Sequence, residues 1–364
     1  MILAKDHLAT FSLNHIYQFL VFFKRLHKAS SMTHSSDQPD LIHSPAIDSQ
    51  ATEPLAIATR SALVGDSLNI RRALPSRQKR LIGAWCFLDN AGPIRYAAGQ
   101  HFSVGEHPHI GLQTFTWMIE GELFHQDSLG YQQIIRLGEI NLMTAGNGIS
   151  HIERSPDGHS PDLHLTQLWI ALPDKARHMP PRFDHYASLP LIEQDDCRLT
   201  VLAGEFMGQT SPVQVYSPLV GLDIVAQAAS QTTLTLNPEF EYGILLLDGQ
   251  LAVNEAPVDC NTLLYLAPGQ QQLLLKLEKN TRLLLIGGEP FKEDVIIWWN
   301  FVARSHAEIE QATNDWLDND LSQNDPSNLD SNELAAKNRF GQITGFEQDR
   351  ISPPPLTQHL RASR

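Results

Sequence analysis

Residues 112–146 read LQTFTWMIEGELFHQDSLGYQQIIRLGEINLMTAG, and this stretch indicates the fold class of the first half of the chain. Short apolar or alternating runs, rich in β-branched and aromatic residues, are separated by turns that carry Gly121, Gly130, Gly138 and Gly146. The stretches 81–89 and 163–173 on either side have the same texture. Closely spaced short strands of this kind predict an antiparallel β-barrel or sandwich rather than alternating strands and helices.

The same pattern returns in the second half, after a connection at 174–190 that carries prolines and histidines. Short apolar runs follow one another from residue 199 to residue 290, with an Asp248-Gly249 pair that is typical of a hairpin turn. We therefore predict an all-β protein built from two β-domains in tandem.

The composition is that of a globular chain with a sizeable core. Of its 364 residues, 42% are hydrophobic and 19% are charged, which excludes global disorder. The net charge of −14 argues against nucleic-acid binding through phosphate contacts, because such binding needs a clustered positive field. The 3 cysteines lie far apart, so we expect no disulfide framework, no cysteine-rich zinc site and a cytoplasmic location.

The two ends of the chain differ from its β-rich middle. The apolar run at 16–23 is shorter than the roughly twenty residues that span a bilayer, so we expect no membrane anchor. Residues 1–56 are predicted to form a flexible extension. At the other end, Ser305 and Glu308 form a capping-box pattern that predicts a short helix. An acidic, partly disordered tail is expected to follow within 305–364.

Candidate metal ligands concentrate in the first half, where nine of the 16 histidines fall between His101 and His185. One motif is HPH at 107–109, and the other is HIE at 151–153, directly after a glycine-rich turn. Residues two apart on a strand face the same side, so each motif aims two donor groups at one point. Three imidazoles and one carboxylate that converge inside a barrel suit Fe(II), Mn(II), Co(II), Ni(II), Cu(II) or Zn(II).

The sequence resembles the pirin family, a branch of the cupin superfamily with two β-barrel cupin domains in one chain. The resemblance covers about residues 57–304. It rests on RRALPS at 71–76, HPHIGLQT at 107–114, IEGELFHQDSLG at 119–130, MTAGNGISHIER at 143–154 and TQLWIALP at 166–173. The fragments RSHAEIEQATNDW at 304–316 and RFG at 339–341 are similar to the C-terminal end of the family.

This resemblance implies two tandem cupin barrels, namely a metal-binding domain at 57–185 and a second cupin domain at 186–304. Pirins bind one metal, usually iron as Fe(II), through three histidines and one glutamate. The matching positions in this sequence are His107, His109, His151 and Glu153. No histidine lies between Tyr186 and Ser305, so we predict that the second barrel has no such metal site.

Further residues are candidates for places beside the metal. Gln113 stands where other cupins carry a glutamate, and we expect it to hydrogen bond behind the ligands rather than bind the metal. His125 and Asp127 lie on the next strand, where a supporting role and ordinary surface polarity are equally compatible with their spacing. Phe115 and Trp117 are candidates for an apolar substrate cavity, although such rings more often fill the core of a barrel.

The resemblance implies two classes of function. Some pirins are quercetin 2,3-dioxygenases, which open the heterocycle of a flavonol with O₂ and release carbon monoxide. In that case Glu153 is expected to be both ligand and catalytic base, and the partner is a small planar aromatic substrate. Animal pirins instead act as iron-dependent transcriptional cofactors, which implies a redox-sensing protein with a protein partner and no direct nucleic-acid contact. A natural substrate other than a flavonoid also stays open.

Overall fold

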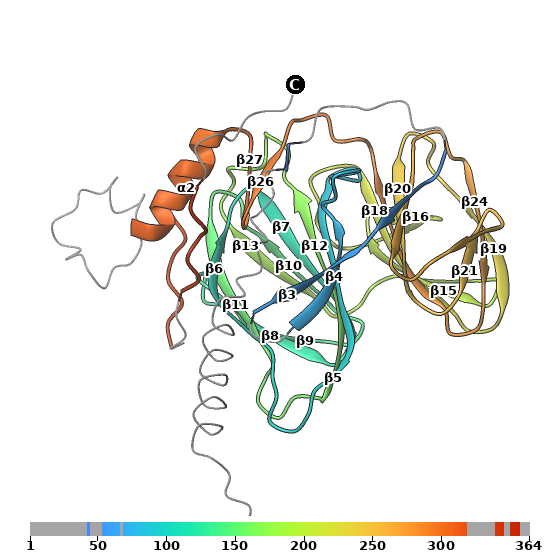
Figure 1. Cartoon of the computed structure of the whole chain (residues 1–364), viewed down its shortest axis with the longest axis horizontal. Helices are drawn as coiled ribbons and strands as arrows, with labels where there is room; N and C mark the ends of the chain where they lie inside the picture. The colour runs from blue at the N-terminus through green and yellow to red at the C-terminus, as the bar shows by residue number, and fades with distance from the viewer. Residues whose placement is uncertain (1–41, 44–52, 66–67, 319–338, 346–349, 357–364) are drawn as a thin grey trace, which may run out of the picture. The chain divides into compact units, whose positions relative to one another are not determined.

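The computed structural model of the chain describes residues 42–43, 53–65, 68–318, 339–345 and 350–356 (Figure 1). Most of the predicted N-terminal extension and most of the acidic tail therefore lie outside the described residues. Within the described ranges, no helical segment combines the length and the apolar character that crossing a bilayer requires.

The first barrel consists of two antiparallel sheets. The larger sheet contains, in spatial order, β13 (Arg182–Tyr186), β10 (Ile140–Thr144), β7 (Leu112–Glu120), β12 (Asp162–Ala171), β5 (Trp85–Arg95), β4 (Leu68–Leu74) and β3 (Arg60–Val64). The smaller sheet contains β6 (Ser103–His109), β11 (Ile149–Arg154), β8 (Glu122–Asp127) and β9 (Gln132–Arg136). Both predicted ligand motifs lie in this smaller sheet, on the neighbouring strands β6 and β11.

The second barrel repeats this plan. Its larger sheet contains β14 (Leu191–Gln194), β15 (Cys197–Ala203), β18 (Leu219–Ala226), β25 (Arg282–Gly288), β20 (Glu241–Asp248), β23 (Thr262–Leu266) and β2 (Leu55–Ala58). Its smaller sheet contains β19 (Ser230–Thr235), β24 (Gln272–Leu277), β21 (Leu251–Val253) and β22 (Ala256–Val258), and β16 (Glu205–Phe206) and β17 (Gln209–Thr210) form a separate hairpin. The two barrels confirm the predicted all-β class. Strand β2 crosses the predicted boundary at residue 57 and pairs with β23 of the second barrel.

A single cluster of buried apolar side chains joins the two barrels. Trp85 and Phe115 of the first barrel lie in the same cluster as Leu202 and Leu284 of the second. The Trp85 Nε1–H also donates to the carbonyl oxygen of Gly287 at 3.2 Å. Since fully burying one such side chain stabilises a fold by about 1.5–3 kcal/mol, this shared core strongly favours association of the barrels.

The C-terminal part of the chain returns to the first barrel. After the second barrel come β26 (Ile296–Trp298), β27 (Phe301–Ala303) and α2 (His306–Asp318), and β26 also pairs with β1 (Ile42–His43). The Val302 N–H donates to the Ile110 carbonyl oxygen at 3.1 Å, and Ile309 and Trp316 of α2 share a buried cluster with Ile110. Residues assigned by sequence to the second domain and the tail thus pack on the first barrel, and the predicted domain division stays a prediction.

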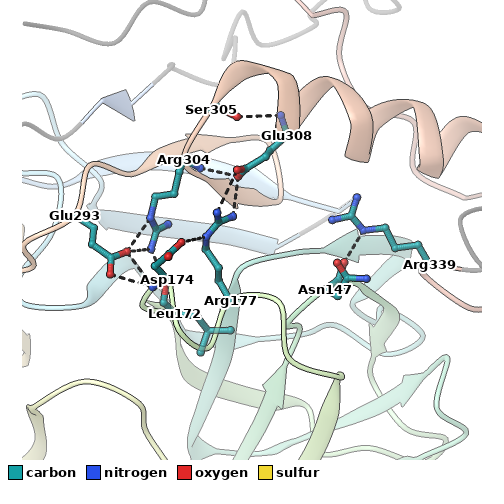
Figure 2. Close-up of polar contacts among 9 residues, drawn as sticks. All are labelled: Asn147, Leu172, Asp174, Arg177, Glu293, Arg304, Ser305, Glu308 and Arg339. Carbon is teal, nitrogen blue, oxygen red and sulfur yellow. Dashed lines mark hydrogen bonds and ion pairs between the residues drawn. The ribbon is translucent and has the colours of Figure 1, made fainter.

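A network of arginines and glutamates fixes the start of α2 (Figure 2). Arg304 Nη2 donates to Glu293 Oε2 at 2.6 Å and to the carbonyl oxygen of Leu172 at 2.7 Å. Arg177 makes a bidentate contact with Glu308 at 2.9 and 3.2 Å. The predicted cap at Ser305 is present, because its hydroxyl accepts the Glu308 N–H at 3.3 Å. The Glu308 carboxylate accepts the backbone N–H of Arg304, which lies one residue before the cap.

The close approach of β27 to the first barrel gives a test of this packing. Gly111 has φ +67°, and a Cβ there would lie 2.0 Å from the Val302 carbonyl oxygen. Gly111→Ala should lower the free energy of unfolding by about 3 kcal/mol, because alanine is strained at this positive φ and its Cβ would overlap the Val302 carbonyl oxygen. Gly158→Ala is the control, because Gly158 has φ +73° and open space around it, so only the strain of about 1 kcal/mol remains. If urea unfolding shows equal losses of unfolding free energy for the two variants, the close approach of β27 to Gly111 is contradicted.

Candidate metal centre

Three imidazoles from two neighbouring strands converge inside the first barrel. His107 pairs in register with His151 across β6 and β11, and His109 follows two residues after His107 on the same face. One nitrogen from each of the three rings lies within 4.8 Å of the other two. Their exposed fractions are 7% for His107, 2% for His109 and 1% for His151. The structure therefore brings together the three histidines that the HPH and HIE motifs predict.

Hydrogen bonds at Nδ1 determine which nitrogen of each ring is free. His107 Nδ1 lies 2.8 Å from the Gly105 carbonyl oxygen, and His109 Nδ1 lies 3.0 Å from the Asn300 carbonyl oxygen. A carbonyl oxygen only accepts, so both rings carry their proton on Nδ1 and hold a lone pair on Nε2. The Nε2 atoms of His109 and His151 face each other at 3.1 Å.

The electrostatics of this cluster fit a metal cation. Burial lowers the pKa of His107 to about 4, and burial together with the neighbouring rings holds the pKa values of His109 and His151 well below their usual range. The rings are therefore neutral near pH 7, and their Nε2 lone pairs repel one another when nothing lies between them. A divalent cation turns this repulsion into attraction, and neutral imidazole is a common ligand for first-row metals.

Glu153 lies beside this cluster, close to His151. Its carboxylate belongs to a second group, formed with His125 and His151, whose candidate ligand atoms also lie within 4.8 Å of one another. The pairing register of β11 with β6 shifts between His151 and Glu153. Glu153 keeps partial contact with solvent, yet desolvation of its carboxylate raises its pKa to about 7. The predicted set of four ligands thus forms two overlapping groups that share His151.

His125 and Asp127 lie beside the cluster, on β8. Both are 2% exposed, so the alternative of ordinary surface polarity is wrong. His125 Nε2 lies 3.1 Å from Asp127 Oδ2, and His125 Nδ1 lies 3.3 Å from His151 Nδ1. The ring of Phe183 stacks on His125 with centroids 4.4 Å apart. The pair therefore lies directly behind one of the three convergent histidines.

Gln113, Phe115 and Trp117 lie away from the histidines. Phe115 and Trp117 belong to the core that joins the two barrels. Gln113 Nε2 donates to Thr144 Oγ1 at 2.9 Å and to the Gln214 carbonyl oxygen at 3.0 Å, so it links β7 to the chain leading into the second barrel. Alternate residues of β7 face opposite sides, and these three share the side that faces the second barrel. Neither of these hydrogen bonds reaches a histidine, so the expected role of Gln113 behind the ligands stays a prediction.

Two features of the cluster had no signal in the sequence. The carbonyl oxygen of Asn300 comes from a residue far along the chain, and a backbone acceptor leaves no mark on residue type. Trp169 of β12 packs edge-on against His109, with ring centroids 5.2 Å apart. Both contacts depend on tertiary structure, because Asn300 lies between β26 and β27 and Trp169 lies on the other sheet of the first barrel.

Comparison with known proteins assigns the chain to a family. The family model described as Pirin matches residues 67–170, and the model described as Pirin C-terminal cupin domain matches residues 221–322. The chain belongs to the pirin family. A Pseudomonas aeruginosa protein provisionally named a quercetin 2,3-dioxygenase is 45% identical over 84% of this chain and 91% of its own length. A pirin-like protein of Caulobacter vibrioides is 36% identical over 69% of this chain and 88% of its own length.

Solved structures of similar proteins confirm the fold of two tandem cupin barrels. A crystal structure titled quercetin 2,3-dioxygenase from Acinetobacter baumannii has a TM-score of 0.79 and 47% identity, covering 85% of this chain and 98% of its own. A bacterial pirin from Escherichia coli, solved in complex with nickel(II), has a TM-score of 0.51 and 21% identity, covering 65% of this chain and 100% of its own. At that identity the Escherichia coli pirin supports the fold alone.

Removal of one convergent imidazole should abolish stable metal binding. His109→Ala leaves two imidazoles and opens a gap at the cluster, so we expect metal analysis of the purified variant to find little bound metal. His178→Ala is the control, because His178 is an exposed histidine on a connecting loop of the same domain. Full metal occupancy in His109→Ala would overturn this ligand set.

Proposed function

We propose that this pirin binds one divalent metal in its first barrel and opens flavonols such as quercetin with O₂, releasing carbon monoxide. The proposed ligands are His107, His109, His151 and Glu153. The observation that carries the proposal is the set of three buried, neutral imidazoles whose lone pairs meet in one space. The likeness to a crystal structure titled quercetin 2,3-dioxygenase, at 47% identity, supports the reaction class.

Fe(II) is the metal that we propose, on the basis of the family. Imidazole and carboxylate donors are also compatible with Mn, Co, Ni, Cu or Zn, and in vitro affinities follow the Irving–Williams order. When bound, a divalent metal supplies Lewis-acid stabilisation of a substrate oxyanion such as the deprotonated 3-hydroxyl group of a flavonol.

Glu153 is the proposed catalytic base. It is the acidic residue of the cluster, and it keeps partial contact with solvent where the histidines have almost none. A carboxylate in this position can take up the 3-hydroxyl proton of an arriving flavonol and release it toward water. Trp169 and Phe183, packed against His109 and His125, keep water away from the inner side of the cluster.

The small planar aromatic substrate is part of the proposal. A cavity of about 310 Å³ lies next to the end of β11 and is lined by residues that include His101, Ser103, Arg154 and His159. Its lining is polar, so the apolar slot expected for a flavonol stays a prediction. The metal-binding role of the domain at 57–185 and the metal-free role of the domain at 186–304 are proposed together with it.

A regulatory function remains the alternative. In that case the metal of a redox-sensing pirin changes a surface that binds a protein partner, without turnover. No contact among the described residues favours this alternative over catalysis, and it stays a prediction, as do a non-flavonoid substrate and the cytoplasmic location. A pull-down that compares the proteins bound by the ferrous and the ferric forms distinguishes this regulatory function from catalysis. Identical sets of bound proteins would count heavily against the regulatory function.

Turnover of quercetin tests the proposed enzyme. Metal-free protein is loaded separately with Fe(II), Mn(II), Co(II), Ni(II), Cu(II) and Zn(II), and quercetin absorbance and carbon monoxide are followed in air. We expect loss of quercetin with matching release of carbon monoxide for at least one metal. No turnover with any of the six would remove the dioxygenase proposal and leave the metal site standing.

The role of Glu153 is tested in the most active metal form. Glu153→Gln keeps the size of the side chain but removes its capacity to take up a proton, so kcat should fall at least roughly 100-fold. Metal analysis should find the three-histidine site still occupied. Glu205→Gln, an exposed carboxylate of the second barrel, is the control. Unchanged kcat in Glu153→Gln would show that another group accepts the proton.

A further inference from the structure

The chain of contacts from Asp127 through His125 to His151 suggests a function beyond packing. We propose that Asp127 and His125 are positioning residues that fix the tautomer of His151, so that its Nε2 lone pair points at the metal position. This inference rests on the metal site proposed above. It assigns a role to two buried side chains of β8 that contact each other and His151.

The Asp127 carboxylate has a fixed orientation. Its Oδ1 accepts the backbone N–H of Leu129 at 2.9 Å and that of Tyr131 at 3.1 Å, in the turn between β8 and β9. Its Oδ2 is therefore turned to His125 Nε2 at 3.1 Å. A carboxylate oxygen accepts hydrogen bonds, so this contact selects the His125 tautomer with its proton on Nε2 and a lone pair on Nδ1.

The lone pair on His125 decides the state of the next ring. His125 Nδ1 lies 3.3 Å from His151 Nδ1, so His151 must donate its Nδ1–H in this pair. A neutral His151 with its proton on Nδ1 has its lone pair on Nε2, the atom that faces His109. Phe183 stacks on His125 with an interplanar angle of 14°, which opposes rotation of the ring.

The three convergent histidines are therefore oriented in two different ways. His107 and His109 donate to the backbone carbonyl oxygens of Gly105 and Asn300. Substitution of a side chain does not remove these acceptors, because they belong to the backbone. His151 depends on a side-chain relay instead. Partners of this kind fix ring orientation and raise the basicity of the ligand, and losing one typically weakens metal affinity roughly 10- to 100-fold.

Asp127→Asn is the sharpest test, because the turn dictates how the new amide must lie. Its carbonyl oxygen keeps the two backbone N–H bonds, so its NH₂ group faces His125 Nε2. His125 is then driven to carry its proton on Nδ1, where it meets the Nδ1–H of His151. Relief of that clash moves the His151 proton to Nε2 and removes the lone pair that would bind metal.

Two measurements read out this change without any assay of activity. In the metal-free variant, ¹⁵N NMR of labelled histidines should show that the His151 proton has moved from Nδ1 to Nε2. Chelator competition with Co(II) should show an affinity roughly 10- to 100-fold lower, with an altered Co(II) absorption spectrum. An unchanged His151 tautomer together with unchanged Co(II) affinity would overturn the relay.

A double-mutant cycle separates the relay from a general loss of packing. His125→Phe keeps a ring under Phe183 and removes the acceptor, so Co(II) affinity should fall. Adding Asp127→Asn to that variant should have no further effect on Co(II) affinity, because the carboxylate acts only through His125. Additive losses would contradict the relay.

The matched control is His164→Phe, which replaces another buried histidine of the first barrel, one hydrogen bonded to Asn90 at 2.9 Å. Its Co(II) affinity should equal that of the wild type, and a comparable loss would contradict a specific role for His125. Failure of the wild-type protein to bind Co(II) or Fe(II) would instead refute the metal site itself. The two proposals therefore fail through different results.

Discussion

The first barrel holds three neutral imidazoles so that their unprotonated nitrogens face one another, with His109 and His151 only 3.1 Å apart. In a buried interior this arrangement is unfavourable unless a cation lies between the rings. Burial prevents the histidines from supplying that cation by protonation, since it lowers the pKa of His107 to about 4. The hydrogen bonds at Nδ1 prevent the rings from turning away. A metal cation is the species that satisfies these constraints together.

The C-terminal segment provides one of the hydrogen bonds that orient these rings. The Asn300 carbonyl oxygen that orients His109 comes from the turn between β26 and β27, after the chain has completed the second barrel. The arginine network at the start of α2 and the contact of Val302 with Ile110 hold this returning segment on the first barrel. The C-terminal part of this chain is thus a structural component of the first barrel.

The ligand motifs could be predicted because their geometry is local. Period-two alternation puts His107 and His109 on one face of a strand whatever the rest of the fold does, and the same holds for His151 and Glu153. The positions of Phe115 and Trp117 were harder to predict for an equally simple reason. Residues 114–117 of β7 alternate polar and apolar, but the strand is buried on both faces, so the alternation does not reveal which face packs on the second barrel.

The amino-acid sequence alone therefore determined the all-β class, the tandem barrels, the pirin resemblance, the cap of α2 and the three convergent histidines. All of these depend on residue type and short spacing. Only the tertiary structure decided which face of β7 packs on the second barrel, that Asn300 hydrogen bonds His109, and that His125 and Asp127 are buried behind His151. These contacts join residues on different strands or far apart in the chain, and several use backbone atoms that every residue shares. Long-range folding, rather than local residue pattern, therefore set the environment of the ligands.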